Sequence, residues 1–193
     1  MKRICTITAS LFIITLLLSF EMPKGWFKTG SMPLSYAMEI DYKEINEGRK
    51  SATLRSLDTN ISGYGAMMQQ ISAEAYRGKR LRLKGWLKSA RVTKKAGFWL
   101  RTNLVGTIMP GAVDDMQDRP IKGDTNWKQY EIVLDVPIMA TVIAFGVTLQ
   151  GGGQVWVDNM VLEVVDNDVP VTKPINKNPY ILEKEPQNLN FEQ

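Results

Sequence analysis

Two tryptophans with cationic neighbours are the residues of this sequence whose chemistry points most directly to ligand binding. Lys84 lies two positions before Trp86, and Arg101 lies two positions after Trp99. Exposed indole rings stack on the apolar C–H faces of sugars, and Lys or Arg donates hydrogen bonds to hydroxyl and carboxylate oxygens. We therefore take these four residues as candidate ligand-binding residues.

The alternation around Trp86 places its side chain on the outer face of a strand. In residues 80–88, Leu81, Leu83 and Leu87 alternate with arginines, lysines and the tryptophan. Because successive side chains of a strand point to opposite faces, the leucines predict a core-facing side and the cations predict an outward side.

A second strand follows, in which Phe98 and Trp99 point to opposite faces. If residues 89–95 form a hairpin loop, matching the core faces sets Leu87 opposite Phe98 and Trp86 opposite Trp99. The hairpin then predicts two tryptophans side by side on one exposed sheet surface, with cations around them. The alternative is a structural aromatic pair, which stabilises a sheet by about 0.2–1 kcal/mol without any ligand.

Three carboxylates lie together in the segment before the next predicted strand, at Asp114, Asp115 and Asp118. Carboxylates in a polar loop bind cations or accept hydrogen bonds from sugar hydroxyls, and we include Asp115 among the candidate ligand-binding residues. The alternative is a solvated turn. As a glycoside-hydrolase pair they are weak candidates, because neighbours in one loop do not place an acid and a nucleophile across a substrate.

The composition excludes several kinds of catalytic and metal site. The 193 residues include no histidine, which removes Ser-His-Asp and Cys-His catalytic arrangements and His-ligated zinc. Cys5 is the only cysteine, so an intrachain disulfide is impossible. Residues 1–20 hold two of the 24 Lys and Arg, and the remaining 22 face 20 Asp and Glu. A net charge of +2 without a basic cluster predicts no nucleic-acid partner.

The hydropathy pattern of the middle of the chain predicts an all-β fold. Short segments alternate with period two and are separated by turn residues. About eight antiparallel strands at such intervals are typical of a jelly-roll β-sandwich. Gly151–Gly153 predicts a tight hairpin turn, and a short helix is expected near residues 72–76. The expected strands span residues 36–40, 52–55, 64–71, 80–88, 96–101, 127–136, 141–149 and 155–165.

Two terminal segments flank this domain, which we place at residues 21–165. Residues 1–20 begin with Lys2 and Arg3 and continue with an uncharged run, as in a secretory signal or an uncleaved anchor. The alternative is a buried first element of the domain. We expect an extracytoplasmic protein, secreted or anchored, that meets the membrane only through this segment. Residues 166–193 contain four prolines and few apolar residues and predict a flexible tail.

Five short stretches follow one another in the chain: Gly85–Lys88, Gly97–Arg101, Asp115–Gly123, Trp127–Tyr130 and Val155–Asn159. As a set they resemble the galactose-binding-like jelly-roll modules, a superfamily that includes many carbohydrate-binding modules. The resemblance covers about residues 20–165 and is to a bacterial subgroup of accessory domains. It implies a β-sandwich and, in sugar-binding members, exposed aromatics on one sheet, which Trp86 and Trp99 match. A fold does not by itself fix the ligand.

The same resemblance implies a structural calcium ion. Such modules often hold calcium between the Glu of an opening Phe-Glu pair and an Asp near the start of the last strand. The matching residues here are Glu21 and Asp158. Carboxylate and carbonyl oxygens are the ligands that calcium prefers. Asn159 departs from the family pattern, which often has a second Asp at this position.

Together these observations predict an exported, non-catalytic module. It would bind a carbohydrate, such as a cell-wall polysaccharide or an acidic glycan, through the two tryptophans and their cationic neighbours. Two alternatives stay open. One is a structural or protein-interaction domain at the cell envelope. The other is a hydrolase that uses carboxylates such as Asp114, Asp115 and Asp158, which the shortage of aligned acid–base candidates disfavours.

Overall fold

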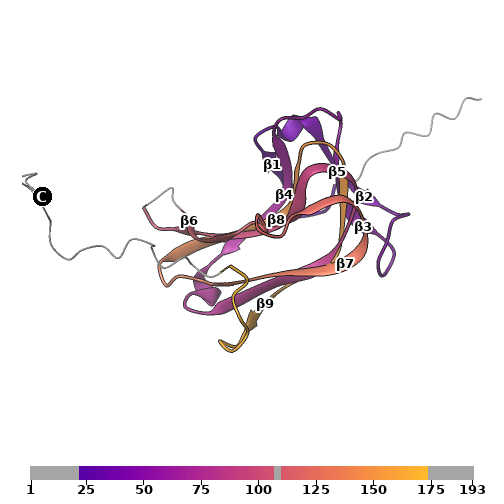
Figure 1. The fold of residues 1–193 in the computed structure, drawn as a ribbon. Helices are drawn as coiled ribbons and strands as arrows, with labels where there is room; N and C mark the ends of the chain where they lie inside the picture. The colour runs from indigo at the N-terminus through magenta and orange to yellow at the C-terminus, as the bar shows by residue number, and fades with distance from the viewer. Residues whose placement is uncertain (1–21, 107–109, 174–193) are drawn as a thin grey trace, which may run out of the picture.

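The chain forms two antiparallel sheets that face each other. A computed structural model describes residues 22–106 and 110–173, which contain nine strands and two short 3₁₀ helices. The strands are β1 (Phe27–Gly30), β2 (Tyr36–Asp41), β3 (Ser51–Ser56), β4 (Tyr64–Ser72), β5 (Arg80–Leu104), β6 (Pro110–Asp114), β7 (Ile121–Asp135), β8 (Ala140–Gln150) and β9 (Gln154–Val165); the helices are η1 (Pro33–Ser35) and η2 (Glu74–Tyr76). Figure 1 shows β6 and β8 in one layer and β7 and β9 in the other. The all-β jelly-roll sandwich predicted from the sequence is confirmed.

Strand β5 is shared by the two sheets. Its first half, residues 80–90, pairs with β9, and the pairing with β7 continues from residue 80 to Ala96. Its second half, residues 95–104, pairs with β8, and residues 100–103 of the same half pair with β6. The sheet that we call the upper sheet therefore has the order β1-β4-β8-β5-β6. The lower sheet has the order β2-β3-β9-β5-β7. One continuous strand thus connects the two layers.

Residues 89–95 continue β5, so the hairpin predicted from the sequence is wrong. Leu87 pairs with Lys128 of β7, whereas Phe98 pairs with Val147 of β8. The segment contains no Gly, Pro, Asn or Asp, the residues that favour tight turns. Arg91 adopts a φ of 52° where the pairing with β7 is irregular, and such a bulge bends a strand and increases its twist. The bend lets β5 leave the lower sheet and enter the upper sheet.

The glycine run between β8 and β9 packs against this bend. The two strands that it joins lie in different sheets, so it is not the hairpin turn predicted from the sequence. Gly153 has a φ of 123°, and a Cβ atom there would lie 2.7 Å from the carbonyl oxygen of Arg91. Only glycine allows this backbone conformation and this close approach.

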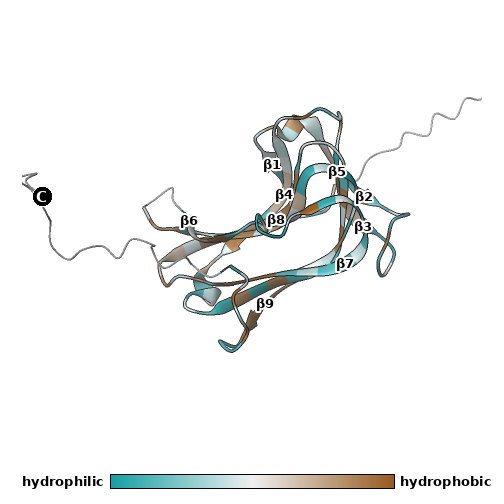
Figure 2. Ribbon diagram, viewed as in Figure 1, coloured by the Kyte–Doolittle hydropathy of each residue, from teal (hydrophilic) through white to brown (hydrophobic). Residues whose placement is uncertain are grey.

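The core lies between the sheets, where the sequence alternation predicted it. Leu81, Leu83 and Leu87 from the first half of β5 are fully buried, as are Phe98 and Leu100 from the second half. Figure 2 shows hydrophobic residues in both layers. Burial of each such side chain contributes about 1.5–3 kcal/mol, so the alternation along β5 stabilises both sheets at once. In the described ranges no helix has the length and hydrophobicity needed to cross a bilayer.

The residues after β9 run beside β7. The backbone N–H of Thr172 donates to the carbonyl oxygen of Val133 at 3.0 Å, and the Thr172 hydroxyl accepts from the Val133 N–H at 2.9 Å. Arg80 donates to the carbonyl oxygens of Asn167 and Val169, both at 2.7 Å. The two bonds to Val133 cover backbone groups that the edge strand β7 would leave open, and the bonds from Arg80 hold the segment after β9 in place. The rest of the predicted flexible tail, residues 174–193, and the predicted signal or anchor lie outside the described residues.

Asp114, the last residue of β6, ties this segment to the sandwich. Its side chain is 1% exposed and accepts hydrogen bonds from Arg119 at 2.7 Å, from the Thr172 hydroxyl at 2.6 Å and from the Met116 N–H at 2.9 Å. Burial alone would raise the pKa of Asp114. The three hydrogen bonds and the positive charge of Arg119 outweigh burial and lower this pKa below its ordinary value.

We expect the substitution Asp114→Asn to lower the free energy of unfolding by about 3 kcal/mol at neutral pH, because it removes one partner of a buried pair. A lowered folded-state pKa stabilises the fold above the unfolded pKa of about 3.9 and stops doing so as the pH falls through the folded pKa. The difference from the wild type should therefore shrink in acid. Urea unfolding of both proteins at neutral and acidic pH measures this difference in the free energy of unfolding.

The matched control is Asp118→Asn. Asp118 also lies 2.8 Å from Arg119, but its side chain is 59% exposed, so its loss should change stability by less than about 1 kcal/mol. Equal effects of the two substitutions, or a difference that persists in acid, would contradict the role assigned to Asp114.

Candidate functional site

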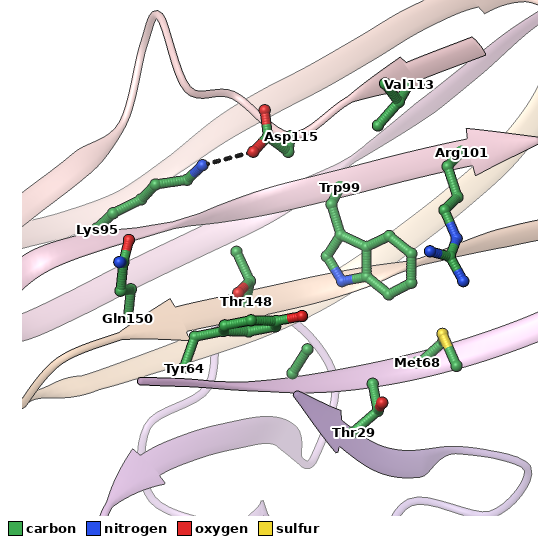
Figure 3. A pocket seen from close by; sticks show the side chains of 11 residues that line it. Thr29, Tyr64, Met68, Lys95, Trp99, Arg101, Val113, Asp115, Thr148 and Gln150 are labelled. Atoms are coloured by element: carbon green, nitrogen blue, oxygen red, sulfur yellow. Dashed lines mark hydrogen bonds and ion pairs between the residues drawn. The ribbon is translucent and has the colours of Figure 1, made fainter. Parts of the chain in front are cut away.

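The candidate site is a hollow of about 400 Å³ on the face of the upper sheet that points away from the core. Its volume falls within the range of small-molecule sites, which is about 300–1,000 Å³. All five strands of the upper sheet contribute to it. Strand β5 provides Lys95, Trp99 and Arg101, and Figure 3 shows these side chains together with their neighbours.

Strand alternation explains why these side chains line one surface. Lys95, Trp99 and Arg101 alternate with the buried residues Phe98 and Leu100, so they point to the opposite face of the sheet. The same rule holds on the neighbouring strands. The other lining residues are Thr29 from β1, Tyr64, Ala66 and Met68 from β4, Thr148 and Gln150 from β8, Val113 from β6, and Asp115 just after it.

Small residues beside Trp99 leave space for the hollow. Trp99 pairs with Gly146 of β8, which in turn pairs with Met68 of β4. A Cβ atom on Gly146 would lie only 1.9 Å from the carbonyl oxygen of Met67. The backbones of β4 and β8 therefore approach each other closely beside the indole, in a way that only glycine permits.

Two aromatic side chains project into the hollow. Tyr64, the first residue of β4, is 43% exposed, and Trp99 is half-buried. The guanidinium carbon of Arg101 lies 5.9 Å from the centroid of the Trp99 ring, a cation–π distance. In Figure 3 the indole lies between Arg101 on one side and Tyr64 on the other. Flat apolar surface and polar groups thus occur together in one open hollow.

The charged groups of the hollow are unequally paired. Lys95 donates to the carboxylate of Asp115 at 2.8 Å, and Lys173 lies 4.0 Å from the same carboxylate. Arg101 has no hydrogen bond or ion pair with any described residue, because its neighbours across the sheet are Ala144 and Val113, whose side chains accept no hydrogen bond. The hollow therefore holds one carboxylate that is neutralised and one guanidinium that is not.

Two buried donors in the hollow lack an acceptor. Among the described residues, the buried side-chain polar atoms without a hydrogen-bond partner are Nε1 of Trp99 and Nε of Arg101. An unsatisfied buried donor costs about 1–3 kcal/mol, and native proteins contain few of them. Both lie on the same face of β5, two positions apart, which singles out this part of the molecule.

The structure brings together three of the five predicted ligand-binding residues. Trp99, Arg101 and Asp115 line the hollow. Trp86 and Lys84 lie on the first half of β5, in the lower sheet, where Trp86 pairs with Gln129 and Asp158 and Lys84 makes an ion pair with Glu163 at 2.9 Å. The prediction that the two tryptophans lie side by side is wrong, because β5 passes from one sheet to the other between them.

Several residues of the hollow were not predicted from the sequence. Tyr64 and Thr148 lie within predicted strands and Gln150 lies just after one, but none of the three was a predicted site residue. Alternation along one strand carries no signal for which strands become neighbours. Thr29 and Val113 lie on β1 and β6, two strands that the sequence pattern did not reveal.

The predicted calcium site is only partly within the described residues. Glu21 lies outside them. Asp158 already accepts three backbone N–H groups, from Asn46 and Glu47 at 3.0 Å each and from Asn159 at 2.8 Å. In residues 22–106 and 110–173 no three acidic or Cys side chains gather as metal ligands. The donors around Asp158 suit a carboxylate without a metal, and calcium binding stays a prediction.

Comparison with known proteins gives one curated relative. An uncharacterized HTH-type transcriptional regulator of Bacillus subtilis strain 168 is 43% identical to this chain over 171 residues, which are 88% of this chain. The chain spans 57% of the length of that regulator. No protein-family profile matches the chain.

Solved structures with the same fold belong to proteins of different kinds. The xylan-binding domain of a Paenibacillus barcinonensis protein, a family 22 carbohydrate-binding module, has a TM-score of 0.54 at 10% identity over 75% of this chain and 88% of its own. A cyclase from Fischerella sp. TAU has a TM-score of 0.55 at 14% identity, over 76% and 87%. The enzymatically active domain of a bacteriophage CBA120 tailspike has a TM-score of 0.55 at 15% identity, over 74% and 20%. Such likeness shows the β-sandwich fold.

We expect Gly146→Ala to lower the free energy of unfolding by about 3 kcal/mol, because the new methyl group would meet backbone that cannot move aside. Denaturant unfolding followed by tryptophan fluorescence measures the change. Gly97→Ala, on the neighbouring strand, is the matched control: its Cβ would lie 3.2 Å from the Sδ of Met116, a flexible side chain that can shift. Equal stability of the Gly146→Ala variant and the wild type would contradict the close approach of β4 and β8.

Proposed function

We propose that this chain is a non-catalytic module that binds carbohydrate in the hollow of the upper sheet. The observation that carries the proposal is the position of Trp99. Its indole lies in an open hollow of about 400 Å³ beside Tyr64 and several polar side chains. The C–H face of a sugar ring packs well on such a flat aromatic surface.

The polar groups around Trp99 fit the hydroxyl groups of a saccharide. Gln150 offers an amide donor and acceptor, Tyr64 offers a hydroxyl, and the Lys95–Asp115 pair offers charged groups at one end of the hollow. Carbohydrate sites commonly need such a mixture, because each sugar ring has apolar faces and polar edges. The likeness in fold to carbohydrate-binding modules is consistent with this use of the sandwich, but it does not establish a ligand.

The carboxylates near the hollow favour binding over hydrolysis. Glycoside hydrolysis by the usual route needs two carboxyl groups on opposite sides of the scissile bond. The hollow has one carboxylate, Asp115, which is paired with Lys95. Asp114 and Asp118 are both paired with Arg119. These pairings support a binding role rather than a hydrolytic one.

The Bacillus relative suggests that the same binding activity can belong to a transcriptional regulator. That relative is called an HTH-type transcriptional regulator, and this chain matches it over 171 residues. The described residues contain two helices of three residues each and no helix that could enter a DNA groove as recognition helices do. We propose that the shared part binds a ligand and does not bind DNA. Export through residues 1–20 remains part of our proposal for this chain.

We expect Trp99→Ala to weaken saccharide binding by about 2 kcal/mol, or roughly 30-fold, as loss of a central aromatic contact does. Affinity electrophoresis against a panel of polysaccharides identifies the ligand, and calorimetry with its oligosaccharides gives the affinity. Trp99→Phe, which keeps a flat ring, should retain part of the affinity.

Trp86→Ala is the matched control, because Trp86 lies on the same strand but in the lower sheet. It should leave the affinity unchanged. If no polysaccharide binds, or if Trp86→Ala weakens binding as much as Trp99→Ala does, the hollow is not the carbohydrate site.

A further inference from the structure

The arginines of this protein differ in how their charge is balanced. Arg80, Arg82 and Arg119 each make an ion pair with a carboxylate within 3 Å. Arg101 is also partly buried, yet it has no ion pair and no hydrogen bond with any described residue. Its one recorded interaction is with the Trp99 ring, at 5.9 Å from the guanidinium carbon. A partly buried guanidinium normally has a hydrogen-bonding partner, and here the protein provides none.

A second donor beside Arg101 is unsatisfied as well. In the described part of the chain, Nε1 of Trp99 and Nε of Arg101 are the buried side-chain polar atoms that lack a partner. Both side chains lie in the same hollow. The two terminal nitrogens of Arg101 are not among these buried atoms without a partner, and no described residue accepts a hydrogen bond from them. On this side of the hollow the described residues therefore offer hydrogen-bond donors without a matching acceptor.

The other charges of the hollow do not supply that acceptor. Asp115, its carboxylate, is bound to Lys95 at 2.8 Å and lies 4.0 Å from Lys173. With Asp115 matched in this way, the unmatched charge of the hollow is the positive charge of Arg101. An anionic ligand is favoured over a neutral one, because it provides both the acceptor and the compensating charge.

We propose, building on the proposed function, that the hollow binds saccharides that carry a carboxylate, such as uronic acid residues, and that Arg101 recognises this carboxylate. A guanidinium donates two parallel hydrogen bonds to a carboxylate. The uronic acid ring has C–H groups that stack on an indole, and its carboxylate projects from the ring edge. Trp99 and Arg101, adjacent on one face of β5, match these two features.

The experiment compares acidic saccharides with the same saccharides after their charge has been removed. Polysaccharides that contain uronic acids, such as polygalacturonate, alginate and glucuronoxylan, are screened with the full chain by affinity electrophoresis. For each binder, calorimetry then compares oligosaccharides with their methyl-esterified and carboxyl-reduced forms. We expect the acidic form to bind at least about tenfold more tightly, as a charged hydrogen-bonded pair would require.

Two substitutions at Arg101 separate charge from geometry. Arg101→Met keeps an apolar stem and should reduce binding of the acidic form by about tenfold or more, and should reduce binding of the reduced form by a much smaller factor. Arg101→Lys keeps the charge but loses the paired donors, so its affinity should lie between those of Arg101→Met and the wild type. Arg49→Met, in an exposed loop, removes the same charge elsewhere and should have no effect. Thermal unfolding verifies that each variant is folded.

The outcomes distinguish this inference from the function on which it rests. Binding of neutral and acidic forms with equal affinity, or equal affinities of the Arg101→Met and Arg49→Met variants for the acidic form, would overturn carboxylate recognition and keep the carbohydrate-binding module. Absence of binding to every saccharide, neutral or acidic, would overturn both. A preference for the acidic form that Arg101→Met abolishes supports the inference.

Discussion

The continuity of β5 determines both the core and the candidate site. This strand spans residues 80–104 and exchanges its neighbours at the bend near Arg91. Its inward residues, such as Leu83 and Phe98, are buried in the core, and its outward residues in the second half face the hollow. Because side chains alternate within each half of β5, a shift of one residue in the second half would exchange its inward and outward sets. The position of Trp99 in the hollow is therefore fixed by the same register that buries the hydrophobic residues.

The sequence predicts those features that depend on the local pattern along one strand. The alternation identified the buried leucines and the outward direction of Trp99 and Arg101, because the face of a side chain depends only on its position along the strand. It could not identify strand neighbours, which depend on contacts between distant segments. The hairpin that paired Trp86 with Trp99 was wrong for that reason. A signal against it was present, since residues 89–95 lack Gly, Pro, Asn and Asp.

The unpredicted parts of the site come from weak strands and distant pairings. β1 and β6 have four and five residues, and β6 begins with Pro110 and Gly111, which are unfavourable within strands. Their patterns are too short to show alternation, yet they contribute Thr29 and Val113 to the hollow. Tyr64 reaches the hollow because β8 lies between β4 and β5 and all three strands share the outer face of the upper sheet. No feature near Tyr64 in the sequence indicates this arrangement.

The pairing of charges sets Arg101 apart from other partly buried charged residues in the described part of the chain. Buried or partly buried charges such as Asp114 are held by several hydrogen bonds, and Lys84 and Arg82 share Glu163. Unsatisfied donors reduce stability, and the two at Trp99 and Arg101 belong to residues that line the hollow. Any ligand that supplies the acceptor binds the folded state alone and stabilises it by mass action. Under the proposed function, ligand binding at Trp99 and Arg101 would stabilise the sheet that carries them.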